Sequence, residues 1–146
     1  MLPSLILSGL KGKLPPLVNP DIVHDFVYVE DVTEAYLLAA AQSGQEPSAV
    51  YNVGAGGQIT LREVVDIVRR ILGINAEPEW GSMPNRQWDT NVWVAENKKI
   101  QEDLGWAPRY TFERGFCSMV NWLTDSPEIL ELYYRLRREA VSGAFC

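Results

Sequence analysis

The stretch from Val23 to Ala41, VHDFVYVEDVTEAYLLAAA, decides the fold that this sequence predicts. Its first half has the alternation of a β-strand, with Phe26 and Tyr28 on one face and Val27 and Val29 on the other. Both faces are apolar, and strands of that kind lie in sheets that are covered by helices on both sides. We therefore expect a buried strand here.

The second half of the stretch changes to helical spacing. Glu30 and Asp31 stand where a helix would begin, and the helix dipole favours acidic side chains at that end. Apolar residues then recur at helical intervals, at Val32, Ala35, Tyr36 and Ala39. The stretch thus predicts a strand that leads directly into an amphipathic helix.

The remaining sequence predicts more helices than strands. Capping residues, apolar spacing and terminal glycines or prolines indicate helices at 3–10, 60–72, 97–104, 111–123 and 126–140. Short strands are expected at 49–53 and 77–80. Four tryptophans are expected in the core: Trp80, Trp93, Trp106 and Trp122. The predicted fold class is α/β (α+β-like), one domain over 1–146 with a small mixed sheet and several packed helices.

Composition and charge exclude some classes of partner. The net charge of -6 argues against a nucleic-acid partner, which would call for a basic face. The apolar N-terminal run is too short to span a bilayer, so no membrane partner is expected. The two cysteines, Cys117 and Cys146, do not form a secreted disulfide framework, which favours a cytoplasmic location.

Three segments, in this order, resemble one known family. They are HDFVYVEDVTEA (24–35), YNVGAGGQITL (51–61) and NRQWDTNVWVAENKKIQEDLGWAPRYTFERG (85–115). They are similar to the carboxyl-terminal part of the extended short-chain dehydrogenase/reductases, the NAD(P)-dependent nucleotide-sugar epimerases and 4,6-dehydratases. The resemblance runs from the start of the chain to about Leu123. It implies the substrate-binding half of such an enzyme, without the N-terminal Rossmann part that binds NAD or NADP.

The resemblance also implies residues that would bind a nucleotide-diphosphate sugar. The family's arginine at the position of Arg86 contacts the diphosphate, although the residues alone favour a solvated surface charge for Arg86. Asp89 would orient that loop or the arginine. His24 stands where the family usually has another diphosphate-binding arginine, and a histidine cannot offer the same bidentate fork.

Two further contacts are implied, each with a purely structural alternative. The segment matching Pro16, Leu17 and Val18 runs beside the base in the family and offers it backbone groups, or it is only a proline-stiffened connector. Trp88 could stack on a base or sugar, or it could pack on its own loop.

No catalytic, cofactor-binding or metal-binding residues are expected. Gly54, Gly56 and Gly57 do not fit the dinucleotide fingerprint, because Thr60 stands at its last glycine position, so a tight turn is the better interpretation. No tyrosine is followed four residues later by the lysine of the family's Tyr-x-x-x-Lys pair. No cluster of His and Cys has metal-ligand spacing.

Three functions remain open at this point. The chain is a nucleotide-diphosphate-sugar binding module without turnover of its own, or one part of a split or truncated epimerase/dehydratase that needs a separate Rossmann half. The third is an interaction scaffold whose ligand site has decayed. Apolar surface that would meet a cofactor domain also predicts a homodimer, formed through the first helix or the last one.

Overall fold

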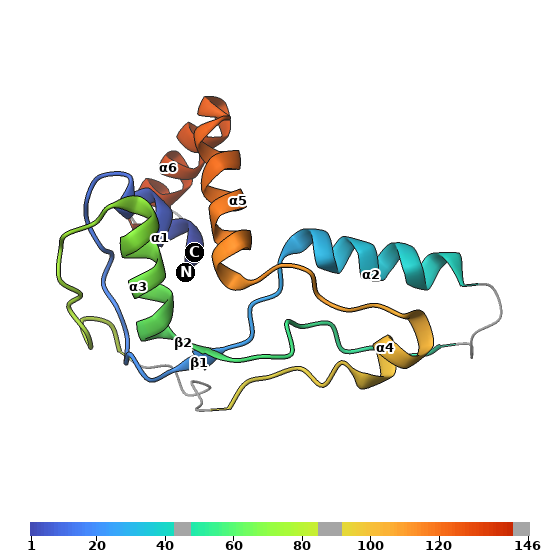
Figure 1. Cartoon of the computed structure of the whole chain (residues 1–146). Helices are drawn as coiled ribbons and strands as arrows, with labels where there is room; N and C mark the ends of the chain where they lie inside the picture. The colour runs from blue at the N-terminus through green and yellow to red at the C-terminus, as the bar shows by residue number, and fades with distance from the viewer. Residues whose placement is uncertain (43–47, 85–91, 142–146) are drawn as a thin grey trace. The chain divides into compact units, whose positions relative to one another are not determined.

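Figure 1 shows the computed structural model, which describes residues 1–42, 48–84 and 92–141. The chain divides into two compact units, each built from separate stretches of sequence. The first unit consists of Met1–Asn19, Arg62–Asn85 and Phe116–Cys146, and the second of Pro20–Leu61 and Arg86–Gly115.

The first unit is helical. It contains α1 (Leu2–Gly9), nearly all of α3 (Leu61–Leu72), most of α5 (Phe112–Thr124) and α6 (Pro127–Val141). Helices α1 and α3 approach closely, since a Cβ added at Gly9 would lie 2.4 Å from Cδ1 of Leu72. Apolar side chains of α1, α3 and α5 are buried: Leu5, Ile6, Leu7, Val64, Val65, Val68 and Leu123.

The second unit contains β1 (Val23–His24), α2 (Val29–Ala41), β2 (Ile59–Thr60) and α4 (Lys98–Leu104). The two strands pair antiparallel, with Val23 opposite Thr60 and His24 opposite Ile59. Helices α2 and α4 pack together around a core of Ala35, Ile100, Leu104 and Trp106, with Leu38, Tyr51 and Val53 against it (Figure 1). Gly105 ends α4 in the left-handed conformation, with φ of 67°.

The predicted α/β class is confirmed, and the predicted helices form within a residue or two of their expected ends. The predicted strand through Val29 is wrong, because only Val23 and His24 pair with another strand. Residues 25–28 stay extended and unpaired, and Asp25 bonds backbone amides with its carboxylate instead of joining a ladder. The strands expected at 49–53 and 77–80 do not form.

The predicted core is partly right. Trp106 is buried, and its indole N–H donates to the Asp31 carbonyl at 2.9 Å. Trp93 and Trp122 are 54% and 47% exposed, so their placement in the core is wrong. Leucine and valine fill the centre of the helical unit, and Trp122 packs edge to face with Tyr133, with ring centroids 6.3 Å apart. No helix in the described ranges is long and apolar enough to cross a bilayer.

Candidate functional site

In the first unit, the segment of Pro16, Leu17 and Val18 is held in one backbone conformation. The Leu17 side chain is buried, at 3% exposure. Its amide donates to the Ser82 hydroxyl at 2.9 Å, and its carbonyl accepts from the Met83 amide at 3.1 Å. The segment is thus tied to a stretch 65 residues away.

These bonds determine which backbone groups of the segment remain for a ligand. Both groups of Leu17 are engaged, and the Val18 carbonyl accepts from the Gly81 amide at 3.4 Å. Among the described residues, none donates a hydrogen bond to the Pro16 carbonyl or accepts one from the Val18 amide. Within that part of the chain, the segment therefore leaves one acceptor and one donor without a partner, two residues apart. Its bonds to Ser82 and Met83 give it a structural role, and its contact with a ligand stays a prediction.

In the second unit, His24 ends β1 beside aromatic rings. Its imidazole lies 5.4 Å from the ring of Phe26, and Phe26 lies 5.2 Å from the ring of Phe112. His24 is half-buried, so part of its ring can still meet a ligand. A hollow of about 310 Å³ adjoins these rings and is lined by Phe26, Ile59 and Phe112, with Arg109 as its cation.

Asp25, next to His24, organises the backbone of this unit. Its carboxylate accepts hydrogen bonds from the amides of Ala55 at 2.6 Å, Gly56 at 3.2 Å and Ala95 at 2.8 Å. Gly54 is required beside it, because an added Cβ would lie 2.6 Å from an Asp25 oxygen and 2.5 Å from the Ala95 Cβ. The glycine turn therefore lets backbone amides reach one carboxylate, in keeping with the tight turn that the sequence predicts.

A second carboxylate, Asp31, fixes the segment that follows α4. Its side chain is 0% exposed and accepts from the amides of Arg109 and Tyr110, both at 3.1 Å. The Arg109 guanidinium lies 3.8 Å from the same carboxylate and 2.9 Å from Glu34. Arg109 is therefore bound to its own unit's acids and not held open for a phosphate.

Sequence reasoning missed the roles of Asp25 and Asp31. One signal could have found Asp25: a charged residue between His24 and Phe26, within an apolar extended stretch, needs hydrogen-bond partners if the stretch is buried. The sequence predicts Asp31 only as an acidic residue at a helix start, and no local pattern distinguishes the buried Asp31 from the exposed Glu30.

The predicted ligand residues fall into three groups. Pro16, Leu17 and Val18 belong to the first unit, and His24 belongs to the second. Arg86, Trp88 and Asp89 lie outside the described residues. In the described ranges there is no group of three His, Cys, Asp or Glu that could hold a metal ion.

Comparison with known proteins gives a family match over most of the chain. The family model described as GDP-mannose 4,6 dehydratase matches residues 2–119. The dTDP-glucose 4,6-dehydratase of Escherichia coli is 31% identical over 139 residues, covering 88% of this chain and 38% of that protein.

Solved structures give the same result. The Bordetella bronchiseptica enzyme WbmF in complex with NAD+ and UDP matches with a TM-score of 0.77 at 25% identity, covering 97% of this chain and 41% of that one. The UDP-glucose 4-epimerase of Thermotoga maritima, with UDP-glucose, matches with a TM-score of 0.71 at 28% identity, covering 84% of this chain and 38% of that one.

The chain thus spans roughly two-fifths of the length of each of these three proteins, and each match covers most of this chain. The chain belongs to the GDP-mannose 4,6-dehydratase family, within the NAD-dependent nucleotide-sugar epimerases and dehydratases, and corresponds to a part of those proteins.

Proposed function

We propose that this chain is a nucleotide-diphosphate-sugar binding module, equivalent to the substrate-binding half of its family and without NAD-binding or catalytic residues of its own. The observation that carries the proposal is the Pro16–Val18 segment, in which Ser82 and Met83 fix Leu17 and leave the neighbouring carbonyl and amide to a ligand. The relatives that hold UDP or UDP-glucose support the ligand class.

The acceptor and donor of this segment match the chemistry of a nucleobase. A base presents donors and acceptors side by side on its edge, so the Pro16 carbonyl would accept from the base and the Val18 amide would donate to it. A backbone pair fixed by distant bonds costs little further entropy on binding. In this proposal Trp88 stacks on the base or the sugar.

The diphosphate needs positive charge, and the second unit is poor in it. The Arg86 guanidinium is proposed to clamp the diphosphate, with Asp89 orienting the loop. His24 is proposed as a weaker contact, because an imidazole presents a single N–H toward a phosphate where an arginine would present two.

Calorimetric titration with UDP, dTDP, CDP and GDP sugars, at pH 6 and pH 8, tests this function. We expect saturable binding to one nucleotide class, lost in Arg86→Ala and kept in Arg135→Ala, which removes the same charge from an exposed site on α6. Stronger binding at pH 6, absent in His24→Ala, would assign the histidine, because imidazoles gain a proton as the pH falls. A folded chain that binds none of the four would refute the module and leave the interaction scaffold.

The second candidate function is one part of a split or truncated enzyme. The observation that favours it is α2, where the apolar side chains of Val29, Tyr36 and Leu37 are largely exposed. Exposed apolar faces of this kind mark contact with another protein surface. Turnover of dTDP-glucose with NAD, absent from the chain alone and restored by adding a separately produced Rossmann half, would establish this candidate.

A homodimer is a separate proposal and uses another exposed surface. Leu5, Ile6 and Leu7 of α1 are buried, so these side chains are not available to a second copy. Helix α6 does expose Leu132 and Leu136. Sedimentation velocity at micromolar concentration is expected to give a dimer that Leu136→Glu dissociates, and a clean monomer would contradict it.

A further inference from the structure

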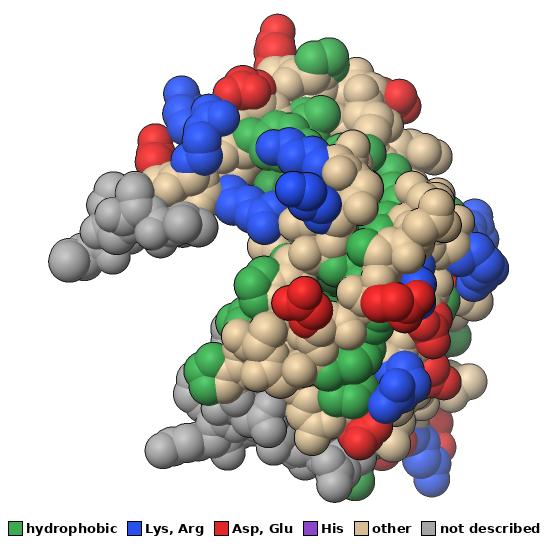
Figure 2. All heavy atoms as spheres, turned by 90° about the vertical axis from the view of Figure 1, so that its left-hand side faces the viewer, with side chains coloured by type: hydrophobic (Ala, Val, Ile, Leu, Met, Phe, Trp, Pro, Cys, Tyr) green, Lys and Arg blue, Asp and Glu red, His purple; other side chains and the backbone are tan. Residues whose placement is uncertain are grey.

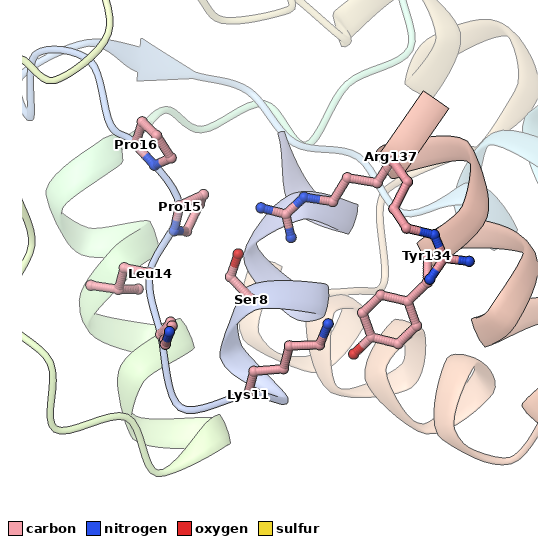
Figure 3. Close-up of a pocket in the computed structure, with 9 residues that line it drawn as sticks. Ser8, Lys11, Leu14, Pro15, Pro16, Tyr134 and Arg137 are labelled. Atoms are coloured by element: carbon pink, nitrogen blue, oxygen red, sulfur yellow. The ribbon is translucent and has the colours of Figure 1, made fainter. Parts of the chain in front are cut away.

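A pocket in the first unit is lined by basic side chains. It has a volume of about 530 Å³ and lies among the end of α1, residues 11–16 and α6 (Figure 3). Its polar lining consists of Ser8, Lys11, Lys13, Tyr134, Arg137 and Arg138. Four of these side chains are cations, and no acidic residue is among those that line the pocket.

This concentration of positive charge is not a property of the whole chain. The second unit has five of the 13 Lys and Arg residues but 11 of the 19 Asp and Glu, so it carries the entire net charge of -6. The first unit has eight of each and is neutral. Half of its cations meet at this pocket, and Figure 2 shows Lys and Arg side chains gathered on the face turned to the viewer. Such clustering attracts anions locally despite the negative total.

The cations are held by different means. The Lys11 ammonium lies 4.2 Å from the ring centroid of Tyr134, and Arg138 pairs with Glu131 at 3.0 Å. Neither Lys13 nor Arg137 has an acidic partner among the described residues. In Figure 3 the side chains of Ser8, Lys11 and Arg137 border the same hollow. Lys11 and Arg138 therefore have partners that orient them, and Lys13 and Arg137 have no acidic partner within the described part of the chain.

The carbonyl groups at the end of α1 do not explain the cluster. Carbonyls at a helix C-terminus attract cations when they lack partners. Here the Leu7 carbonyl accepts from the Tyr134 hydroxyl at 3.3 Å, and the Gly9 carbonyl from the Gly12 amide at 2.8 Å. The Ser8 carbonyl accepts the amides of Lys11 at 2.9 Å and Lys13 at 3.1 Å. These carbonyls have hydrogen-bond partners, so they do not account for the basic side chains around the pocket.

We propose that this pocket, whose lining lies in the first unit and includes Pro16, binds a small anion of the phosphate or diphosphate class. The guanidinium of Arg137 supplies a planar fork, and the ammonium groups of Lys11 and Lys13 supply point charges around it. The nearly buried Ser8 adds a hydroxyl that can donate to a phosphate oxygen. This inference does not depend on the proposed function.

Calorimetric titration of the full chain with inorganic pyrophosphate tests the pocket. The titration is done in the Arg86→Ala background, so that any binding that remains cannot come from the proposed diphosphate clamp. We expect saturable binding that Lys11→Gln and Arg137→Gln each weaken by about tenfold or more. Arg135→Gln is the matched control on the same helix, and its affinity is expected to stay within about twofold, since Arg135 does not line the pocket.

Two results would overturn the proposal. One is the absence of saturable heat in the Arg86→Ala background, from protein whose thermal unfolding is unchanged. The other is an equal loss of affinity in Arg135→Gln and Arg137→Gln, which would mean diffuse charge attraction. If Arg137→Gln does not fold, the affinity of Lys11→Gln is compared with that of Arg135→Gln instead. Nucleotide-sugar titrations are a separate measurement. A chain that binds pyrophosphate but no nucleotide sugar would support this site and refute only the proposed function.

Discussion

At the residue scale, the Asp25 side chain connects two distant stretches of the second unit. Its carboxylate holds Ala55, Gly56 and Ala95 by three amide bonds. Asp25→Ala leaves these amides without their acceptor, and we expect a loss of about 2–4 kcal/mol in the free energy of unfolding. Urea unfolding measures it. Asp66→Ala on the exposed side of α3 is expected to stay within about 0.5 kcal/mol, and equal urea midpoints for the two variants would refute the role.

Tyr110 allows a test by pH. Its hydroxyl donates to the Glu30 carboxylate, and this bond, helped by desolvation and the nearby charge, raises the pKa of Tyr110 above the ordinary value for tyrosine. The stability that the bond contributes is therefore present below tyrosine's ordinary pKa and lost as the pH rises through the raised pKa. Glu30→Gln is expected to lower the pKa of Tyr110.

The measurement is the ultraviolet absorbance of tyrosinate across an alkaline titration, with Tyr110→Phe identifying the contribution of this residue. Glu34→Gln is the control, because Glu34 binds Arg109 and not the phenol. An unchanged titration in Glu30→Gln would show that the hydrogen bond does not determine the pKa of Tyr110.

At the scale of the element, the first turn of α2 contains two acids in opposite surroundings. Glu30 is exposed, whereas Asp31 is fully buried and accepts the amides of Arg109 and Tyr110. Asp31→Asn and Glu30→Gln each remove one negative charge from the same helix end. The lost interaction with the helix dipole is expected to lower the free energy of unfolding by about 0.3–1 kcal/mol in each variant. Asp31→Asn also leaves a buried amide donor unpaired, so we expect it to cost about 2–3 kcal/mol more in urea unfolding. Similar losses in both variants would contradict this account.

The helices of this chain could be predicted from the sequence, and the sheet could not. Helix α3 is specified by neighbours three and four residues apart and ends at Gly73, whose φ is 64°. A strand needs a partner that is distant in sequence. The alternation at 26–29 is typical of a strand. In the structure, however, the amides of Ala55 and Ala95 donate to the Asp25 carboxylate and not to the backbone of a neighbouring strand.

The same reasoning applies to the candidate site. The family resemblance pointed to Pro16, Leu17 and Val18 as a segment. The resemblance could not tell which of their backbone groups form hydrogen bonds within the chain, because the partners of Leu17, which are Ser82 and Met83, lie in a distant stretch of sequence. The basic pocket was also not predicted, since Arg137 and Arg138 have the pattern of a solvated helix face and only folding brings Lys11 beside Tyr134.

At the scale of the whole molecule, connectivity determines how the chain is expected to unfold. The first unit is assembled from three stretches of sequence and the second from two, so neither can form from one continuous segment. The divisions after Leu61 and Gly115 fall inside helices α3 and α5. Unfolding one unit therefore removes the ends of helices that belong to the other. We expect one cooperative transition rather than two.

Native-state hydrogen exchange tests this expectation unit by unit. The slowest amides of α3 report on the first unit, and the Ala95 amide, bonded to Asp25, reports on the second. If unfolding is one transition, the most protected amides of both units give the same free energy of opening within about 0.5 kcal/mol, and Asp25→Ala lowers both together. If Asp25→Ala lowers protection only in the second unit, the units unfold independently and the shared helices do not couple them.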